Sequence, residues 1–250
     1  MRIHLVNPNT TVSMTDKIAA AARAAARPGT EIVARTSTMG PASIEGHYDD
    51  ALALPGLLAA IAEAERAGDQ PTDAHVIACF DDTGLEAART LARAPVIGIG
   101  EAGFHLASLI AHRFAVVTTL SRSIPVIEAN LMRYGLDRRC CAVRASEVAV
   151  LELEDPASGA RGRIAAEIAR TVAKDGAEAV VLGCAGMADL ARALTAEHGV
   201  PVIDGVASAV ALAEALVGTG LATSKRGAYA PPRPKVYTGL LADFAPKDTA

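Results

Sequence analysis

The sequence predicts an α/β protein built from two pseudo-symmetric lobes, each a parallel β-sheet flanked by helices. Three observations support this fold class. Apolar strand-like runs alternate with Ala-rich amphipathic stretches along the 250-residue chain, which is typical of right-handed βαβ units. Runs such as 179–182 are continuously apolar, as expected for parallel strands buried on both faces. The same strand, loop, helix and strand unit also occurs twice, around Cys79 and around Cys184.

The repeat extends beyond the two cysteines. After each cysteine a second apolar run opens with Pro-Val-Ile, 16 residues later in the first copy and 17 in the second. A Thr-Thr pair precedes each cysteine, by 68 residues at Thr11 and by 65 at Thr119. This spacing predicts an internal duplication, with one lobe formed by 1–98 plus 205–250 and the other by 99–204.

Each expected element follows from its local pattern. Apolar runs predict strands in the first half at 2–7, 31–37, 73–79 and 95–99, and in the second at 113–118, 140–146, 178–183 and 201–203. Ala-rich amphipathic stretches with high helix propensity predict helices at 12–26, 49–66, 84–93, 101–112, 123–134, 159–174, 187–197 and 206–218. The segment after Gly218 carries four prolines, so we expect it to be extended and packed over the surface or against a neighbouring subunit.

Composition excludes several classes of protein. Hydrophobic residues make up 51% of the chain and charged residues 21%, which is typical of a globular protein with a sizeable core. A net charge of -4 with no Trp argues against nucleic-acid binding, which needs clustered Lys and Arg. Apolar runs are too short to span a bilayer, and Met1 leads directly into a strand pattern with no signal sequence. We therefore expect a cytoplasmic protein with reduced thiols and no membrane partner.

The chain contains four cysteines, Cys79, Cys140, Cys141 and Cys184. A disulfide between Cys79 and Cys184, or burial of both as small apolar side chains, are the structural alternatives. Zinc is disfavoured because no CxxC or HxxxH spacing supplies neighbouring ligands. The matched placement of Cys79 and Cys184 favours catalysis, whereas Cys140 and Cys141 open an expected strand and are assigned to packing.

Two thiols at equivalent strand ends suit proton transfer at one carbon from both faces. Ligands of parallel sheets collect beyond the carboxyl ends of the strands, where Cys79 and Cys184 both lie. One group must remove a proton while the other delivers one. Cysteine suits this role because its pKa of about 8.5 is lowered at a helix N-terminus, and each cysteine precedes an expected helix.

Proton abstraction beside a carbonyl places negative charge on its oxygen, which needs hydrogen-bond donors already in position. Backbone N–H groups after each strand are candidates, from Phe80 to Gly84 and at Ala185 and Gly186. Further candidates for substrate binding are the Asn9 amide, which also suits a turn or N-cap, and the hydroxyls of Thr118 and Thr119, which also suit capping of the next helix.

Several stretches together resemble one enzyme family. They are Asn7-Pro8-Asn9-Thr10, the segment from Gly40 to Tyr48, Cys79-Phe80, the segment from Leu182 to Ala188, and Pro201-Val202-Ile203-Asp204-Gly205. This set resembles the aspartate/glutamate/hydantoin racemase superfamily, and within it the hydantoin and allantoin racemase branch. The resemblance implies two lobes with an active site in the cleft between them, no cofactor, and Cys79 and Cys184 as the acid/base pair; no metal is expected, on the ligand spacing given above.

The residues after each cysteine bear on the substrate. Relatives that act on free aspartate or glutamate typically carry Cys-Asn-Thr and Cys-Thr, whereas this chain has Cys79-Phe80 and Cys184-Ala185. The resemblance therefore points away from a free amino acid. The branch usually reads Phe-Gly-Asp-Pro-Gly after the first cysteine, but here the sequence is Phe80-Asp81-Asp82-Thr83-Gly84. This departure bears on substrate preference more than on reaction type.

The segment after Gly40 is expected to form a loop over the cleft. Resemblance implies that Ser43 and Ile44 line the pocket, while we expect Glu45 to serve as a structural hydrogen-bond or ion partner. A lone His beside charged neighbours is usually a surface residue, so His47 is not assigned to catalysis. Asp204 follows the last expected strand and is expected to cap the next helix.

The resulting hypothesis is a cofactor-independent racemase that acts at C5 of allantoin or another 5-substituted hydantoin, with a small-molecule substrate as its partner. Two alternatives stay open. An arylmalonate-type decarboxylase resembles this superfamily but keeps only the second cysteine, so Cys79 argues against it. A non-catalytic small-molecule binding protein would keep the cleft without proton exchange. The Ala-rich surface and the Pro-rich tail further predict a homo-oligomer.

Overall fold

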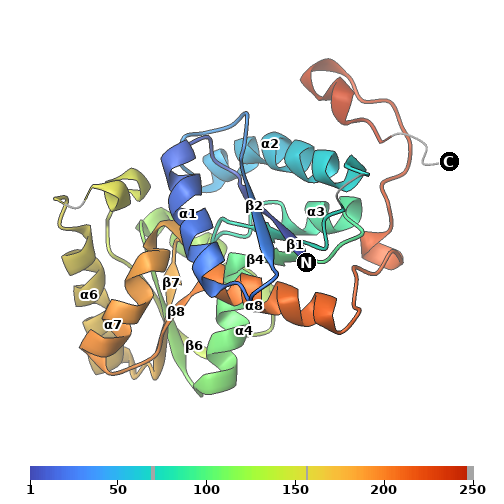
Figure 1. Cartoon of the computed structure of the whole chain (residues 1–250). Helices are drawn as coiled ribbons and strands as arrows, with labels where there is room; N and C mark the ends of the chain where they lie inside the picture. The colour runs from blue at the N-terminus through green and yellow to red at the C-terminus, as the bar shows by residue number, and fades with distance from the viewer. Residues whose placement is uncertain (69–70, 156, 247–250) are drawn as a thin grey trace.

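The computed structural model describes residues 1–68, 71–155 and 157–246, and these form two four-stranded parallel sheets with helices on their faces (Figure 1). The first sheet has the order β2-β1-β3-β4, from β1 (Arg2–Asn7), β2 (Glu31–Thr36), β3 (Ala74–Ile77) and β4 (Val96–Gly98). The second has the order β6-β5-β7-β8, from β5 (Phe114–Thr118), β6 (Cys140–Ala145), β7 (Ala179–Gly183) and β8 (Val202–Asp204). The predicted α/β class with two lobes is confirmed.

The two sheets share one topology. Adding four to each strand number of the first sheet gives the order of the second, and every pairing is parallel. The carboxyl ends of β1 and β3 therefore correspond to those of β5 and β7. This equivalence supports the proposed internal duplication, with Cys79 following β3 and Cys184 following β7.

The helices lie close to the predicted ranges. They are α1 (Val12–Ala25), α2 (His47–Arg66), α3 (Leu85–Leu91), α4 (Ile99–Ile110), α5 (Ile124–Arg133), α6 (Ala160–Arg170), α7 (Ala191–His198) and α8 (Gly205–Gly218). Two differences matter near the site. The strand predicted at 73–79 ends at Ile77, so Cys79 lies in a loop. The helix predicted at 187–197 begins as a 3-10 turn at Ala185–Leu190.

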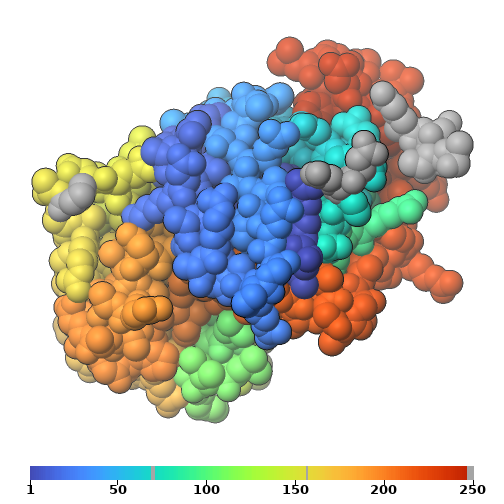
Figure 2. Space-filling model, in the orientation of Figure 1, coloured from blue at the N-terminus to red at the C-terminus, as the bar shows by residue number. Residues whose placement is uncertain are grey.

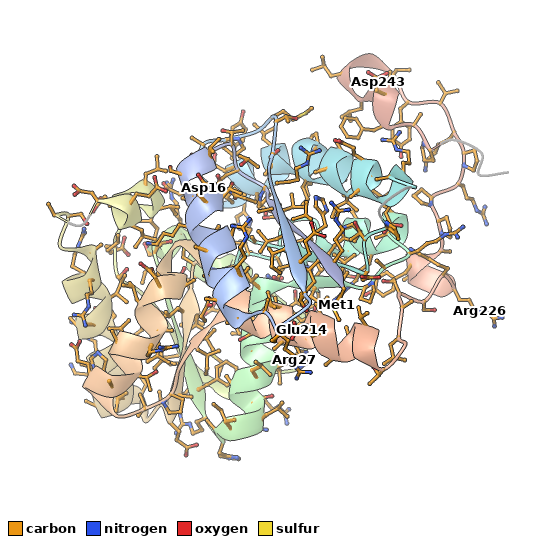
Figure 3. The ribbon with its side chains drawn as sticks, viewed as in Figure 1. Met1, Asp16, Arg27, Glu214, Arg226 and Asp243 are labelled. Carbon is orange, nitrogen blue, oxygen red and sulfur yellow. The ribbon has the colours of Figure 1, made fainter. Side chains whose placement is uncertain are left out.

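Each lobe donates one helix to the junction between the lobes. α4 follows the last strand of the first sheet but packs against β7, while α8 follows β8 of the second sheet and packs against α1, β3 and α4. The buried Glu214 of α8 accepts hydrogen bonds from the Arg27 N–H (2.8 Å) and the Thr30 hydroxyl (2.7 Å) of the first lobe (Figure 3). The boundaries proposed at residues 98 and 205 coincide with the starts of these two helices.

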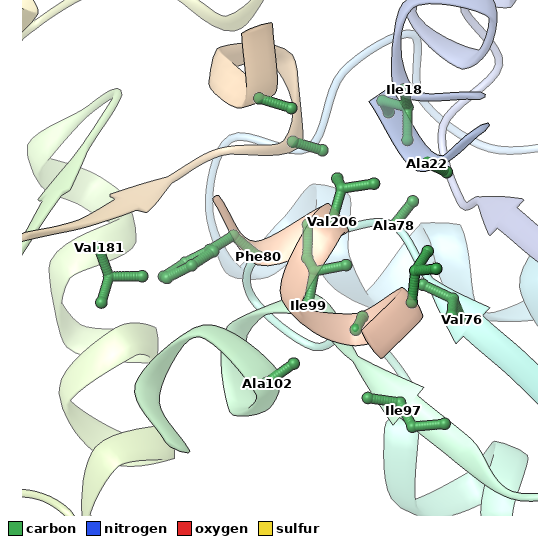
Figure 4. Close-up of a cluster of buried hydrophobic side chains, with 14 of the residues drawn as sticks. Ile18, Ala22, Val76, Ala78, Phe80, Ile97, Ile99, Ala102, Val181 and Val206 are labelled. Carbon is green, nitrogen blue, oxygen red and sulfur yellow. The ribbon is translucent and has the colours of Figure 1, made fainter. Parts of the chain in front are cut away.

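The largest hydrophobic core crosses the junction. It contains side chains from both sheets together with α1, α4 and α8, and Figure 4 shows the Phe80 ring directed from the loop after β3 toward Val181 of β7. Gly205 lets α8 approach α4 closely, since a Cβ there would lie 2.5 Å from the Ile99 carbonyl oxygen. The two strand ends that carry Cys79 and Cys184 are thus held by one shared core.

The C-terminal segment after α8 has two parts: the first packs on the first lobe, and the second extends away from it (Figure 1). Its first part packs on α3, where the Lys225 ammonium donates to the Arg89 carbonyl (2.7 Å) and the Tyr229 ring faces the Arg89 guanidinium. Residues 230–246 are largely exposed, including Val236 and Leu240. The predicted surface packing therefore holds for the first part only. Among the described residues, no helix combines the length and hydrophobicity needed to cross a membrane.

Candidate active site

A cavity of about 40 Å³ lies between the lobes at the carboxyl ends of β1, β3, β5 and β7. Both lobes contribute to its lining, which consists of Asn9, Met14, Ile44, Ala78, Cys79, Phe80, Asp81, Thr119, Ser123, Val150, Gly183, Cys184 and Ala185. Cys79 and Cys184 thus face one space from two different sheets, each partly exposed within it.

The structure brings most of the predicted site residues to this cavity. The lining includes Asn9, Ile44, Cys79, Phe80, Thr119, Cys184 and Ala185, and it does not include Ser43, Gly84, Thr118 or Gly186. Gly84 has a φ of 66° and precedes α3, so it forms the turn that ends the Cys79 loop. Ser43 is partly buried in the loop beside Ile44.

Asn9 reaches the cavity from a tightly bonded turn after β1. The amide of Asn7 donates to the Asn9 side-chain oxygen (2.9 Å), which also accepts from the Thr11 N–H (3.0 Å). The Asn9 amide nitrogen donates to the Met14 sulfur (3.1 Å). An amide nitrogen carries two N–H groups, so one donor of Asn9 stays available to a ligand while the rest of the side chain fixes the turn.

The loop that carries Cys79 is clamped to the start of α4 through Asp82. The buried Asp82 carboxylate accepts from the N–H groups of Gly100 (2.9 Å) and Glu101 (2.8 Å) and from the Tyr134 hydroxyl (2.7 Å). A Cβ on Gly98 would lie only 2.1 Å from this carboxylate, so glycine is required there. Asp82 itself has a φ of 52°, a conformation that Asp tolerates better than most residues. The clamp fixes the loop without using the cavity.

The surroundings of Cys79 disfavour its thiolate. Burial is the largest cause and raises its pKa well above the ordinary thiol value, and the nearby Asp81 carboxylate raises it further. Hydrogen bonding from the Thr83 hydroxyl and from the Asp81 N–H lowers the Cys79 pKa and so partly offsets this increase. In the structure the single Thr83 hydroxyl proton is donated to Asp50 of α2 at 2.6 Å, so Thr83 lies between the sulfur and a carboxylate outside the loop.

Cys184 shows the same balance with a different set of neighbours. Burial raises its pKa to about 11, a hydrogen bond from the Gly186 N–H lowers it, and Asp81 raises it from the opposite lobe. Gly186 therefore lies against the sulfur. A Cβ at that position would lie 2.9 Å from the Leu153 side chain and 3.7 Å from the Cys184 sulfur.

The expectation that helix N-termini lower both thiol pKa values is wrong for this structure. α3 begins only at Leu85, six residues after Cys79, so the thiol lies outside the first turn, where the dipole acts. Cys184 directly precedes a 3-10 turn, but burial outweighs the one backbone hydrogen bond. Burial therefore favours the thiol form of both groups.

Thr118 and Thr119 end the strand that corresponds to β1 in the second lobe. The buried Thr118 hydroxyl donates to the Gly183 carbonyl at 3.0 Å and so joins the ends of β5 and β7. Thr119 lines the cavity with Ser123. No side-chain cap is present at the start of the following 3-10 turn or of α5, so the capping role considered for the two threonines is wrong.

The loop from Gly40 to Gly46 closes one side of the cavity. Ile44 lines the cavity, and the Glu45 carboxylate accepts from the Val150 N–H of the second lobe at 3.0 Å. The Arg122 guanidinium donates to the Glu45 carbonyl at 3.4 Å. The structural role predicted for Glu45 is confirmed, and it joins the lobes. His47 is exposed, as predicted.

Contacts of α1 reinforce this closure. The Lys17 ammonium forms an ion pair with Asp189 at 3.2 Å and donates to the Leu153 carbonyl at 3.3 Å. The Ser13 hydroxyl donates to Glu154 at 2.8 Å. In Figure 2 the blue surface of the first residues borders the yellow and orange surface of the second lobe. The cavity is therefore shut on several sides.

All four cysteines are free thiols, so the disulfide alternative for Cys79 and Cys184 is wrong. In the described parts of the chain, no three His, Cys, Asp or Glu side chains gather as a metal site. The prediction that Asp204 caps the last helix is confirmed, because its carboxylate accepts from the N–H groups of Val206 and Ala207, both at 2.9 Å.

Residue-level reasoning missed several lining residues. Met14 lies in α1, and Ser123 and Val150 lie in short 3-10 turns, with no sequence pattern that marks them. Asp81 differs, because its position in the altered loop after Cys79 was visible in the sequence. Its side chain is 9% exposed and its pKa is raised to about 7, mainly by burial and then by the carboxylates of Asp50 and Asp82.

Comparison with known proteins gives a consistent result. The family model Asp/Glu/Hydantoin racemase matches residues 3–213. A hydantoin racemase of Rhizobium meliloti is 50% identical over 239 residues, covering 96% of this chain and 98% of the relative. A hydantoin racemase of Pseudomonas sp. (strain NS671) is 46% identical over 250 residues, covering 100% of this chain and 99% of the relative.

A solved structure agrees with these sequence relatives. The structure of an allantoin racemase from Klebsiella pneumoniae superimposes with a TM-score of 0.94 at 47% identity, covering 99% of this chain and all of the other. Sequence and fold thus agree over nearly the whole length, and the chain belongs to the Asp/Glu/hydantoin racemase family, as an isomerase of the racemase type.

Proposed function

We propose that this racemase interconverts the enantiomers of a hydantoin-type ring at C5, with allantoin or another 5-substituted hydantoin as substrate. The observation that carries the proposal is the pair Cys79 and Cys184, which follow equivalent strands and line one cavity from opposite lobes. The curated relatives named hydantoin racemase and the neighbour named allantoin racemase support the ring class.

The proposed chemistry uses the two sulfurs and no cofactor. One cysteine, as thiolate, takes the C5 proton from one face of the ring and becomes a thiol. The electron pair moves onto the adjacent carbonyl oxygen, and the opposite thiol delivers its proton to the other face and becomes the thiolate. The roles reverse for the other enantiomer. The two thiols titrate as a coupled pair.

The cavity lining contains candidate donors for the charge that develops on the ring oxygen. The Asp81 and Gly186 N–H groups already bond to the sulfurs. The hydroxyls of Thr119 and Ser123 and the free N–H of Asn9 face the same space, and we assign substrate binding to this set together with Ile44, Phe80 and Ala185.

The first test follows single enantiomers of allantoin and of 5-benzylhydantoin in deuterium oxide. We expect loss of optical rotation together with deuterium at C5, seen by NMR. If neither substrate loses rotation, the proposed reaction is wrong. Binding without exchange at C5 would instead indicate the non-catalytic alternative.

The second test addresses the two sulfurs. Cys79→Ser and Cys184→Ser are each expected to abolish racemisation, because one face then lacks its acid or base, while each variant still exchanges the C5 proton of one enantiomer only. Cys140→Ser, outside the cavity, is the matched control and should keep full activity. Full activity in either cavity variant would rule out two-sided proton transfer.

We further propose a cytoplasmic, homo-oligomeric enzyme with the lobe boundaries given above. A reducing compartment keeps both catalytic thiols free, as the mechanism requires.

A further inference from the structure

Asp81 is a cavity residue whose side chain the two-cysteine reaction does not use. It lines the cavity beside Cys79, and its charge acts on both Cys79 and Cys184. Its side chain is nine-tenths buried, with a relative exposure of 9%. Across the described residues, its carboxyl group has no hydrogen-bond or ion-pair partner.

The backbone around Asp81 is held firmly. The Asp81 carbonyl accepts from the Asn130 amide of α5 at 2.9 Å, and Asn130 is itself buried. The next residue, Asp82, is clamped by Gly100, Glu101 and Tyr134. Bonds from the second lobe therefore hold the Asp81 backbone in place and fix where its side chain starts at the cavity.

Such a carboxyl group is costly to keep. Burying a carboxylate without a partner costs several kcal/mol, and this one also opposes the thiolate that the reaction requires. A residue with that cost and no structural bond of its side chain is a candidate for ligand recognition. Burial raises the pKa of Asp81 to about 7, so the group is a carboxylate in mildly alkaline solution. In that form it only accepts hydrogen bonds, and its ligand must supply N–H or O–H groups.

We infer that Asp81 determines substrate specificity, by accepting hydrogen bonds from the N–H groups of a polar, ureido-type substituent at C5. This inference rests on the proposed function. The ring itself is the less suitable partner, because negative charge develops on its carbonyl oxygen during proton transfer and an adjacent carboxylate opposes that charge. A substituent rich in N–H groups gives the carboxylate its missing partners and screens it from the reacting centre.

The test compares two substrates of nearly equal size. Allantoin carries a ureido group at C5, and 5-isobutylhydantoin carries an apolar group with the same number of heavy atoms. kcat/KM for racemisation of each is measured with the unaltered enzyme, Asp81→Gly and Asp81→Asn. Asp16→Asn, an exposed position on α1 (Figure 3), is the matched control.

Asp81→Gly is expected to lower the ratio of the kcat/KM for allantoin to that for 5-isobutylhydantoin by about tenfold to a hundredfold, the range for losing a hydrogen bond to a charged group. Activity on the isobutyl substrate should be kept or rise, which also shows that the variant is folded. Asp81→Asn retains one neutral acceptor, so its ratio should lie between that of the unaltered enzyme and that of Asp81→Gly. Asp16→Asn should leave the ratio unchanged.

Equal losses on both substrates in Asp81→Gly would overturn the inference, because Asp81 would then act on the ring or the thiols. An unchanged ratio in both Asp81 variants would overturn it as well, while leaving the proposed function intact. Absence of racemisation of either hydantoin by the unaltered enzyme would contradict the proposed function and this inference together.

Discussion

At the residue scale, Cys79 and Cys184 are partly buried thiols whose surroundings oppose ionisation. The pKa of Cys79 is raised well above its usual value and that of Cys184 to about 11, in both cases chiefly by burial. Asp81 adds to both shifts. Each sulfur also has a backbone N–H donor, from Asp81 or Gly186, which supports the thiolate once it forms.

These shifts predict an alkaline pH profile. A raised thiol pKa leaves little thiolate at pH 7, and the thiolate fraction grows as pH rises toward that pKa, so kcat/KM should increase from pH 7 to pH 8.5. Initial rates for each enantiomer, measured in buffers of constant ionic strength, check this. Asp81→Asn removes one cause of the shifts and should move the rising limb to lower pH, whereas Asp16→Asn should not. A flat profile between pH 6.5 and 8.5 would mean that a thiolate already exists at neutral pH.

At the element scale, the loop from Gly40 to Gly46 connects the first lobe to Val150 of the second. Gly40 has a φ of 124° and Gly46 a φ of 112°, so both ends adopt conformations that favour glycine. A cavity of about 40 Å³ has room for only a few water molecules. We therefore expect entry of the proposed substrate to require movement of this loop, after which the Glu45 bond to Val150 would re-form.

Removing that bond should weaken closure over the substrate. Glu45→Ala deletes the oxygen that accepts from the Val150 N–H at 3.0 Å, and we expect about a tenfold fall in kcat/KM, since a hydrogen bond to a charged group contributes about 1.5 kcal/mol or more. Glu45→Gln is the control, because it removes the same charge but keeps an acceptor, and it should stay near the unaltered rate. Equal rates in the two variants would show that the bond does not contribute.

Much of this organisation follows from local sequence pattern. The alternation of apolar runs and Ala-rich stretches predicted both sheets, and the paired spacing placed Cys79 and Cys184 at matching strand ends, because a strand and a helix each leave a clear periodicity. Asp82 could not be assigned in this way. Its role depends on N–H groups 18 and 19 residues later and on a hydroxyl 52 residues later, and no local pattern encodes contacts at that distance.

The thiol pKa values could not be predicted for a related reason. Burial of a sulfur depends on how closely two lobes approach, and that distance is determined by α4, α8 and the core they share. The position of a cysteine relative to a helix was visible in the sequence. Burial, the main cause of the raised thiol pKa values, was not. Met14, Ser123 and Val150 likewise reach the cavity only because the lobes close on each other.

At the scale of the whole molecule, the two lobes are joined rigidly on one side and by breakable contacts on the other. The shared core and the crossing of α4 and α8 form the joint, while Glu45 with Val150 and Lys17 with Asp189 lie across the cavity. Such an arrangement allows a small opening of the lobes about the core. In the proposed reaction, we expect the thiols to approach the ring from opposite sides only when the cleft shuts.

The same view of the whole molecule bears on its assembly. After Tyr229, the chain leaves the first lobe and presents apolar side chains to solvent, with Val236 at 87% and Leu240 at 99% exposure. Burying such groups against a second copy recovers about 25 cal/mol for each Å² of apolar surface, so we expect an oligomer held in part by this segment. Light scattering after size exclusion should give at least twice the 25.6 kDa mass of one chain. A chain ending at Ala230 keeps Tyr229 against Arg89 and should show a lower mass or weaker association. A monomeric full-length protein would contradict this assignment, as would an oligomer that is unchanged after truncation.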